Sequence, residues 1–479
     1  VALLACLTVA PALLRVLGFG VFWPFGFKRN TKKIRLFTGE SAETFVEPRS
    51  RVWQAIANAT VNHPGLILVA SFLILALPAY AGLSVPITYD AIAELDPNQP
   101  SVLGTRLLER HFPLGETGPI TVLAYHPGAN FDARAERRSV AFLTKELLDL
   151  TYTDSHGEKT HPVLSVRSLT NPLGDPPGAY SPFTPAGRRK MAAANHPRCK
   201  ERFLSSMPGY AGEVTRLELV CKYDPFSSES VRLLDNIEER LLAKTSDPKS
   251  PWHGASFDLA GITAGIRDLE AVNRSDTFRV GLLVSLSVLG VLVFLLRRPA
   301  VSLYLIFTVL VGYFVSLGLT RLFFAWMLGD TFEGLDWKLP LFLFVILVAV
   351  GEDYNIYLVT RVFEEQRRRG PLEGLREAVV RTGGIITSCG VIMAGTFASM
   401  LTSTLRGIFE LGFALALGVL LDTFVIRTIL VPAFLALWAR WTSNLDDRAG
   451  KGKTAAPHFE PASELSKTRL GRSKRLRVG

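Results

Sequence analysis

The hydrophobic pattern of this chain is a series of long apolar runs, and these runs predict membrane-spanning helices. About 20 consecutive apolar residues cross the hydrocarbon core of a bilayer as a helix. Two of the six full-length runs carry charged residues in their interior, and the other four are uncharged. In chain order the six runs are residues 64–82, 280–296, 301–320, 339–360, 382–404 and 408–438. A further run at residues 1–20 predicts part of a seventh span.

A polar region, residues 84–277, separates the span at residues 64–83 from a predicted bundle of five spans at residues 278–438. Strand-like and helix-like patterns alternate in the polar region, which favours an α/β domain with βαβ-type packing. Residues 170–212 are rich in Pro, Gly and basic residues and predict an irregular insertion. We expect strands at 119–125, 215–221 and 256–260, and helices at 101–111, 135–150 and 231–244. The predicted fold class is a polytopic α-helical membrane protein with a large extracytoplasmic α/β domain.

The distribution of Lys and Arg predicts the orientation, because short cytoplasmic loops carry an excess of both residues. Basic residues gather on one side of the predicted spans, before residue 64, at Arg297 and Arg298, in the loop 361–381 and in the tail. Residues 21–63 are therefore predicted to be a basic cytoplasmic linker, and residues 439–479 a basic, disordered cytoplasmic tail. This orientation places the α/β domain outside the cell membrane.

Composition supports the membrane assignment, with 48% hydrophobic and only 20% charged residues. The net charge of +10 could indicate a nucleic-acid partner. However, the tail alone contains ten Lys and Arg against four Asp and Glu, and a basic segment beside anionic membrane lipids accounts for this charge. We therefore expect membrane lipids as partners and no nucleic acid.

The cysteines and histidines define no metal site or enzyme centre. The eight histidines are scattered without metal-ligand spacing, and no phosphate-binding loop is present, so we expect neither an enzyme nor a metal. Cys199 and Cys221 share the long polar segment and could form a disulfide in an oxidising compartment. The sequence leaves this pairing open.

A weak internal repeat links the two ends of the chain. Residues 10–14 (APALL) and 431–435 (VPAFL) both close a long apolar run and precede a basic stretch. Secondary transporters are often built from such repeats. Because the first residue is Val rather than Met, we expect residues 1–20 to be the last span of a truncated, homologous first repeat. The missing N-terminal half would then be a partner of this chain, and the chain would be a fragment or the product of a late-called start.

Two adjacent carboxylates, Glu352 and Asp353, lie inside the run 339–360. An ionisable residue within a span is costly and predicts a functional site. Asp353 lies eight residues before Arg361, roughly 12 Å along a helix. Neighbouring residues on a helix point about 100° apart, so one carboxyl alone is expected to titrate, and we assign this role to Asp353. The alternative is that both carboxylates only hold helices together.

Other residues of this run could support proton transfer at Asp353. Tyr354 supplies a hydroxyl, Tyr357 lies one turn from Asp353, Asn355 is a further polar neighbour, and Gly351 permits close helix packing. In the next run, Gly390 and Gly395 predict a packing face. Ser388 and Thr396 could extend a proton path or bond their own backbone.

The last run contains Glu410, Asp422 and Arg427. The spacing favours an ion pair between Asp422 and Arg427 near the cytoplasmic interface, although Asp422 could instead support the relay. Glu410 is expected at the outer interface.

Three segments carry a family resemblance: GEDYNIYLVTR at 351–361, RTGGIITSCGVIMAGTFASM at 381–400 and ELGFALALGVLLDTFVIRTILVPAFLALW at 410–438. They resemble the C-terminal half of MMPL-type transporters of the resistance-nodulation-division superfamily. In that family an Asp-Tyr pair is part of the proton relay, and here it falls on Asp353 and Tyr354. In the family an apolar residue is common at the position that Glu352 occupies in this chain. Glu352 is therefore either a second carboxyl of the relay or a feature of a subgroup.

The resemblance implies twelve spans in two repeats, a porter domain at residues 84–277 and location in a bacterial inner membrane. It implies proton-driven export of lipids or other hydrophobic molecules, with protons as the coupling ion and no other cofactor. Since the superfamily includes monomers and trimers, a homo-oligomer stays open.

Two other functions compete with transport. A receptor or scaffold of the same fold, as in sterol-sensing relatives, would not need Asp353 to titrate. An intramembrane aspartyl protease could use Asp353 and Asp422. However, Glu352 precedes Asp353 where the Gly-x-Gly-Asp signature of those proteases requires Gly.

Overall fold

A computed structural model describes residues 51–153, 157–175 and 183–451, with short pieces at 8–9, 11–13, 15–16, 31–35 and 41–45. The predicted span at residues 1–20 falls largely outside the described residues, and the tail beyond residue 451 falls wholly outside them. The chain divides into two compact units, residues 1–55 and 56–479. The first unit contains an antiparallel hairpin, β1 (Thr31–Arg35) and β2 (Ser41–Phe45), within the segment predicted to be a linker. Helix α2 (Arg51–Asn62) begins in the first unit and continues into the second.

Six helical segments among the described residues are long and apolar enough to cross a membrane. Proline occupies one of the first two positions of several of them, where its missing N–H has no helical partner to lose. The last segment continues from α13 through the π-helix η5 into α14. The helices are α3 (Pro64–Leu83), α9 (Ile262–Leu296), α10 (Pro299–Leu328), α11 (Leu339–Arg369), α12 (Pro371–Ala398), α13 (Arg406–Leu421), η5 (Asp422–Leu430) and α14 (Val431–Lys451). Short 3-10 turns, η3 (Gly329–Thr331) and η4 (Ser399–Thr402), follow α10 and α12.

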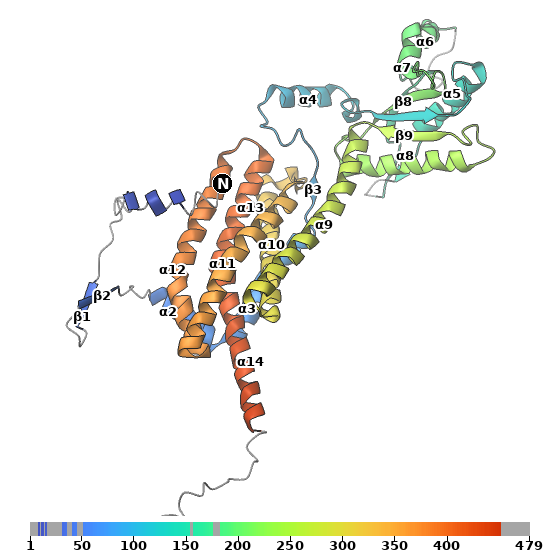
Figure 1. Cartoon of the computed structure of the whole chain (residues 1–479). Coiled ribbons are helices and arrows are strands. Elements are labelled where there is room, and N and C mark those ends of the chain that lie inside the picture. Colours follow the sequence, from blue (N-terminus) through green and yellow to red (C-terminus); the bar gives the residue numbers. More distant parts are fainter. Residues whose placement is uncertain are drawn as a thin grey trace, which may run out of the picture. The chain divides into compact units, whose positions relative to one another are not determined.

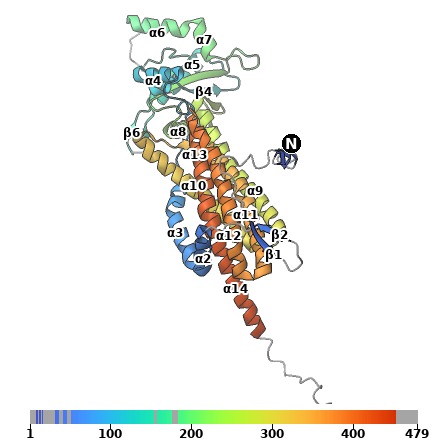
Figure 2. The same cartoon turned by 90° about the vertical axis from the view of Figure 1, so that its left-hand side faces the viewer.

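Helices α10, α11 and α13 pack side by side, and α12 packs against α11 and α13 (Figures 1 and 2). In the most apolar window of each segment, 61% of α10 and of the last segment is buried, against 17% of α3 and of α12 and 6% of α9. The described residues therefore leave much of α3, α9 and α12 uncovered.

Several helices are longer than their apolar runs. Helix α9 starts directly after the sheet and enters the bundle as one continuous helix (Figure 1). The charged end of α11 continues to Arg369, where Glu365 is buried and pairs with Arg361 and Arg369. Helix α14 reaches Lys451, so the first part of the tail is helical, and the prediction of disorder is wrong for these residues.

The α/β domain is built on a four-stranded sheet with the order β7-β8-β4-β9, in which all neighbours are antiparallel. Each of its two βαβ units has parallel strands separated by one strand of the other unit, which is the split, ferredoxin-like arrangement. The predicted βαβ packing is therefore present in this split form. Its elements are β4 (Ile120–Tyr125), α5 (Arg134–Leu148), β7 (Val163–Arg167), β8 (Val214–Cys221), α8 (Ser228–Ser246) and β9 (Ser256–Ala260).

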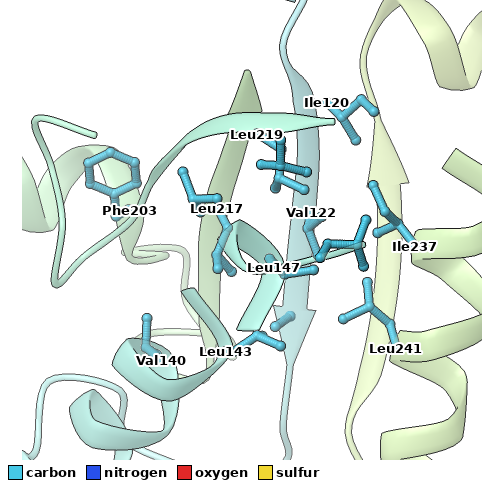
Figure 3. Close-up of a cluster of buried hydrophobic side chains, with 14 of the residues drawn as sticks. Ile120, Val122, Val140, Leu143, Leu147, Phe203, Leu217, Leu219, Ile237 and Leu241 are labelled. Carbon is cyan, nitrogen blue, oxygen red and sulfur yellow. The ribbon is translucent and has the colours of Figure 1, made fainter. Parts of the chain in front are cut away.

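The core of this domain lies between the sheet and its two long helices. Figure 3 shows Val122 and Leu219 of the sheet facing Leu143 of α5 and Ile237 of α8. Alternating residues of β4 are buried, as its period-two pattern requires. Smaller elements complete the unit: β3 (Ile87–Thr88), which pairs in parallel with β10 (Leu335–Asp336), α4 (Pro100–His111), η2 (Leu114–Glu116), and the hairpin β5 (Tyr152–Thr153) and β6 (Lys159–Thr160).

The segment 170–212 is not wholly irregular as predicted, because it contains α6 (Pro185–Asn195) and α7 (Pro197–Phe203). Cys199 lies in α7 and Cys221 ends β8, and both are buried free thiols. The disulfide that the sequence left open is therefore not formed in this structure. Burial raises the pKa of the Cys221 thiol to about 12.

We predict that Gly318→Ala destabilises the contact between α3 and α10. A Cβ at Gly318 would overlap the carbonyl oxygen of Pro78 in α3 and lie 2.8 Å from the amide nitrogen of Gly82. Overpacking of this kind costs about 1–3 kcal/mol of unfolding free energy. The control is Gly290→Ala in α9, where the structure has open space. Thermal unfolding in detergent should show a loss for Gly318→Ala alone, and equal behaviour of the two variants would contradict the close crossing.

Candidate functional site

Helix α11 directs its two adjacent carboxylates to different surroundings. Glu352 is 4% exposed and Asn355 is fully buried, so both face the interior of the bundle. Asp353 is exposed, and Tyr357, one turn further on, is 44% exposed. The prediction that Glu352 and Asp353 cannot face the same partner is confirmed. The assignment of Asp353 as the titrating group stays a prediction.

The π-helix η5 brings Asp422 and Arg427 into direct contact. In an α-helix, residues five apart point about 140° away from each other. A π-helix has i→i+5 hydrogen bonds, so residues at this spacing come close to the same face. The predicted ion pair is therefore present, but both side chains are buried inside the bundle rather than placed at its interface.

Arg427 connects η5 to the middle of α11. Its Nη2 donates to the carbonyl oxygen of Gly351 at 3.1 Å, and its guanidinium lies 4.6 Å from the ring centroid of Tyr354. A Cβ at Gly351 would lie at ordinary van der Waals distance, 3.8 Å from Asp422 Oδ2, so this contact does not require the glycine that the sequence analysis assigned to close packing. Arg427 thus binds the backbone one residue before Glu352 and the ring one residue after Asp353.

Glu352 has no comparable partner among the described residues. Both of its carboxylate oxygens are buried and form no ion pair among the described residues, and the buried Asn355 side chain is its neutral polar neighbour. The charged groups close enough to interact electrostatically with Glu352 are Asp422, Arg427 and Asp353. This cluster of described residues around Arg427 therefore contains two buried carboxyl groups, those of Glu352 and Asp422, and one guanidinium.

The residues predicted on α12 separate into buried and exposed positions. Gly390 packs directly on Thr423 of η5, which confirms its packing role and adds a contact that the sequence analysis missed. Gly395 has open space where a Cβ would be, so the described part of the chain gives it no packing role. Ser388 and Thr396 are exposed and donate to the carbonyls of their own helix, at 2.9 and 3.0 Å.

Tyr354 is the other group that links α11 to α12. It is half-buried, and its hydroxyl lies 3.5 Å from Met393 Sδ. Its ring therefore lies between buried Arg427 and the neighbouring helix, while Asp353 points away from this cluster.

A second polar network lies where the α/β domain meets the starts of α11 and α13. Glu410, in the first turns of α13, is fully buried by protein and accepts from Arg406 Nε at 2.7 Å and from the backbone N–H of Asp336 at 2.9 Å. Lys338, at the start of α11, donates to Glu94 at 3.0 Å. Sequence reasoning missed this network because it joins residues more than 200 positions apart.

A cavity of about 350 Å³ lies between the α/β domain, α9 and the segment that contains β3. Its lining includes Tyr89, Asp90, Asp224, Glu270 and Glu333. Burial raises the pKa of Asp224, and the nearby charge of Asp90 raises it further, while the N–H donated by Phe226 opposes both effects. The cavity is therefore polar and acidic, and it favours a neutral or cationic group over an anion.

Comparison with known proteins identifies the family. The model of the MMPL family matches residues 94–459. The chain belongs to the MMPL family. It is a multi-pass membrane protein that combines a helical membrane bundle with an α/β domain.

Three relatives illustrate the extent of the similarity. "Putative membrane protein ActII-3" of Streptomyces coelicolor is 30% identical over 92% of this chain and 50% of its own length. The "Apo-petrobactin exporter" of Bacillus anthracis is 26% identical over 93% of this chain and 53% of its own length. "Probable transport protein MmpL12" of Mycobacterium tuberculosis is 32% identical over 49% of this chain and 20% of its own length. This MMPL chain spans about half the length of the first two relatives.

We predict that Arg427→Met lowers the unfolding free energy by about 3–5 kcal/mol, because it leaves the carboxylate of Asp422 buried without its partner. Adding Asp422→Asn should recover much of the loss. The control is Lys200→Met, which breaks an exposed pair with Asp132 and should cost at most about 1 kcal/mol. Denaturant unfolding measures all three, and an equal cost for Arg427→Met and Lys200→Met would contradict the buried pair.

We predict that Asp224→Asn raises stability at neutral pH. A carboxyl whose pKa is higher in the folded state than in the unfolded state costs stability once it ionises, and this cost develops as the pH rises above the unfolded value, about 3.9. The Asn oxygen can still accept from Phe226 N. Thermal unfolding across a pH series should show a gain at neutral pH that vanishes below about pH 4. The control, Asp247→Asn, changes an exposed carboxylate in a similar turn and should show no such gain.

Proposed function

We propose that this MMPL chain is part of a proton-driven exporter of lipids or other hydrophobic molecules, with Asp353 and Tyr354 in its proton relay. Family membership and the transporter names of two relatives support export. The lipid-like substrate and the Asp-Tyr relay rest on the resemblance of residues 351–361 to the family motif.

The observation that carries this proposal is the exposed carboxylate of Asp353 in the middle of a spanning helix. A charged side chain in contact with lipid at this depth costs several kcal/mol, so such groups face protein or water. Asp353 makes no ion pair among the described residues, and Tyr357 extends the same face one turn further. This face of α11 therefore needs a cover that supplies polar groups.

We infer that the cover is a homologous membrane half. The chain spans about half the length of its relatives, and helix α12 beside α11 leaves Ile385, Ile392 and Ser388 exposed. Apolar contacts would then surround a narrow polar site at Asp353. Protons would reach this site between the two halves, and the carboxyl would be shielded from lipid.

Movement would pass from the proton relay to the α/β domain through helices α11 and α9. One proton that crosses the membrane supplies about 2.3 kcal/mol per 100 mV of potential. Neutralising Asp353 changes how α11 packs against the covering half, and the Lys338–Glu94 pair connects the start of α11 to the segment leading into the α/β domain. This pair and continuous α9 would transmit the movement to the domain.

The remaining assignments complete the proposal. The α/β domain, residues 84–277, would lie outside a bacterial inner membrane and act as the porter domain. Membrane lipids surround the bundle, protons are the coupling ion, and assembly into a homo-oligomer is compatible with the superfamily. A non-transporting receptor or scaffold of the same fold is the second candidate, since it would not need a titrating Asp353.

We predict that Asp353→Asn abolishes export while the protein still folds and inserts. The assay uses inverted vesicles that carry the intact transporter and measures movement of a fluorescent phospholipid with and without a proton gradient. Because Asn cannot carry a proton, the variant should fall to the level of wild type without a gradient. The matched control is Asp276→Asn, an exposed carboxylate in α9. Unchanged export by Asp353→Asn would refute the relay, and gradient-independent movement in wild type would refute proton coupling.

A further inference from the structure

Glu352 is an ionisable group of α11 that the Asp-Tyr relay does not use. It lies inside the bundle with 4% of its surface exposed, and it forms no ion pair among the described residues; its neutral polar neighbour is the Asn355 side chain. Two other buried carboxylates in the bundle, unlike Glu352, have basic partners. Glu410 accepts from Arg406 and from the Asp336 backbone, and Glu365 pairs with Arg361 and Arg369.

The charges around Glu352 do not balance if every group is ionised. Asp422 and Arg427 of η5 and Asp353 of its own helix are the charged groups that act on it, and Asn355 is its polar neighbour. On α12, the Cys389 thiol is a hydrogen-bonding neighbour of Tyr354, which lies two residues after Glu352. Arg427 is already bound by Asp422, by the Gly351 carbonyl and by the Tyr354 ring. An ionised Glu352 would therefore be an unpaired buried charge, which is far more costly than a neutral carboxyl.

We propose that Glu352 is a second proton-binding site of α11, distinct from Asp353 and neutral while Asp422 holds Arg427. The proton is taken up by a Glu352 carboxylate oxygen from water and is returned to water when the carboxyl ionises. No other group changes its charge. As a step of transport this inference rests on the proposed function, but binding of the proton itself does not.

The geometry also provides a partner for the ionised state. Arg427 lies beside Gly351, one residue from Glu352, and the charges of Glu352 and Arg427 interact. The contact between Asp422 and Arg427 depends on the π-helical turn of η5. If η5 rearranged toward an α-helix, the two side chains would separate, and Arg427 could pair with Glu352. Proton loss from Glu352 would thus favour one arrangement of η5, and proton binding the other.

Infrared spectroscopy of the full chain in lipid nanodiscs tests this proposal, because a protonated carboxyl has a carbonyl band that a carboxylate lacks. We expect this band in wild type at neutral pH. It should shift when glutamate is labelled with ¹³C at the side-chain carboxyl and stay in place when aspartate is labelled. In Glu352→Gln the band should disappear, whereas Asp353→Asn should retain it. The matched control, Glu410→Gln, removes a buried glutamate that is fully paired and should also retain it.

Three results would overturn the proposal: no protonated carboxyl in wild type, a band that shifts with aspartate label, or a band that survives in folded Glu352→Gln. Should Glu352→Gln fail to fold, the isotope labels in wild type decide the question. The measurement needs neither substrate nor gradient. A glutamate band together with unchanged export by Asp353→Asn would therefore refute the relay and leave this site standing.

Discussion

The membrane half of this protein depends on the high cost of an uncompensated charge in a low-dielectric interior. Arg427 meets this constraint for the centre of the bundle, since it neutralises Asp422 and binds the backbone of α11 at Gly351. The same residue thereby joins η5 to the middle of α11. In the packed bundle Glu352 lies on the inward face of α11 and Asp353 on its exposed face, so the two adjacent carboxyls have different environments.

The two polar networks of the bundle have complementary roles. The inner one, around Arg427, is incompletely paired at Glu352 and is therefore sensitive to protons. The outer one, around Glu410, is fully paired and joins the starts of α11 and α13 to the segment before the α/β domain. A change at the first network can reach the second through α11, because both networks hold this helix.

Much of the architecture could be predicted from the sequence, because spans and strands leave strong periodic signals. Strand β9 has the predicted bounds, and β4 and β8 differ from prediction by one residue. Helices α6 and α7 were missed, since they have little apolar periodicity and begin at prolines within a segment typical of loops. The burial of Asp422 and Glu410 was also missed. In the first case a π-helix changed the angular spacing, and in the second the partners come from distant segments. Sequence spacing reveals neither.

The exposed carboxylate of Asp353 has a consequence for how such a protein is made. A copy of this bundle that remained alone in lipid would keep the charged group of Asp353 against hydrocarbon. This contact would cost several kcal/mol. Polar groups of the covering half would remove this cost, so the residue proposed to carry protons would also favour docking of the two membrane halves.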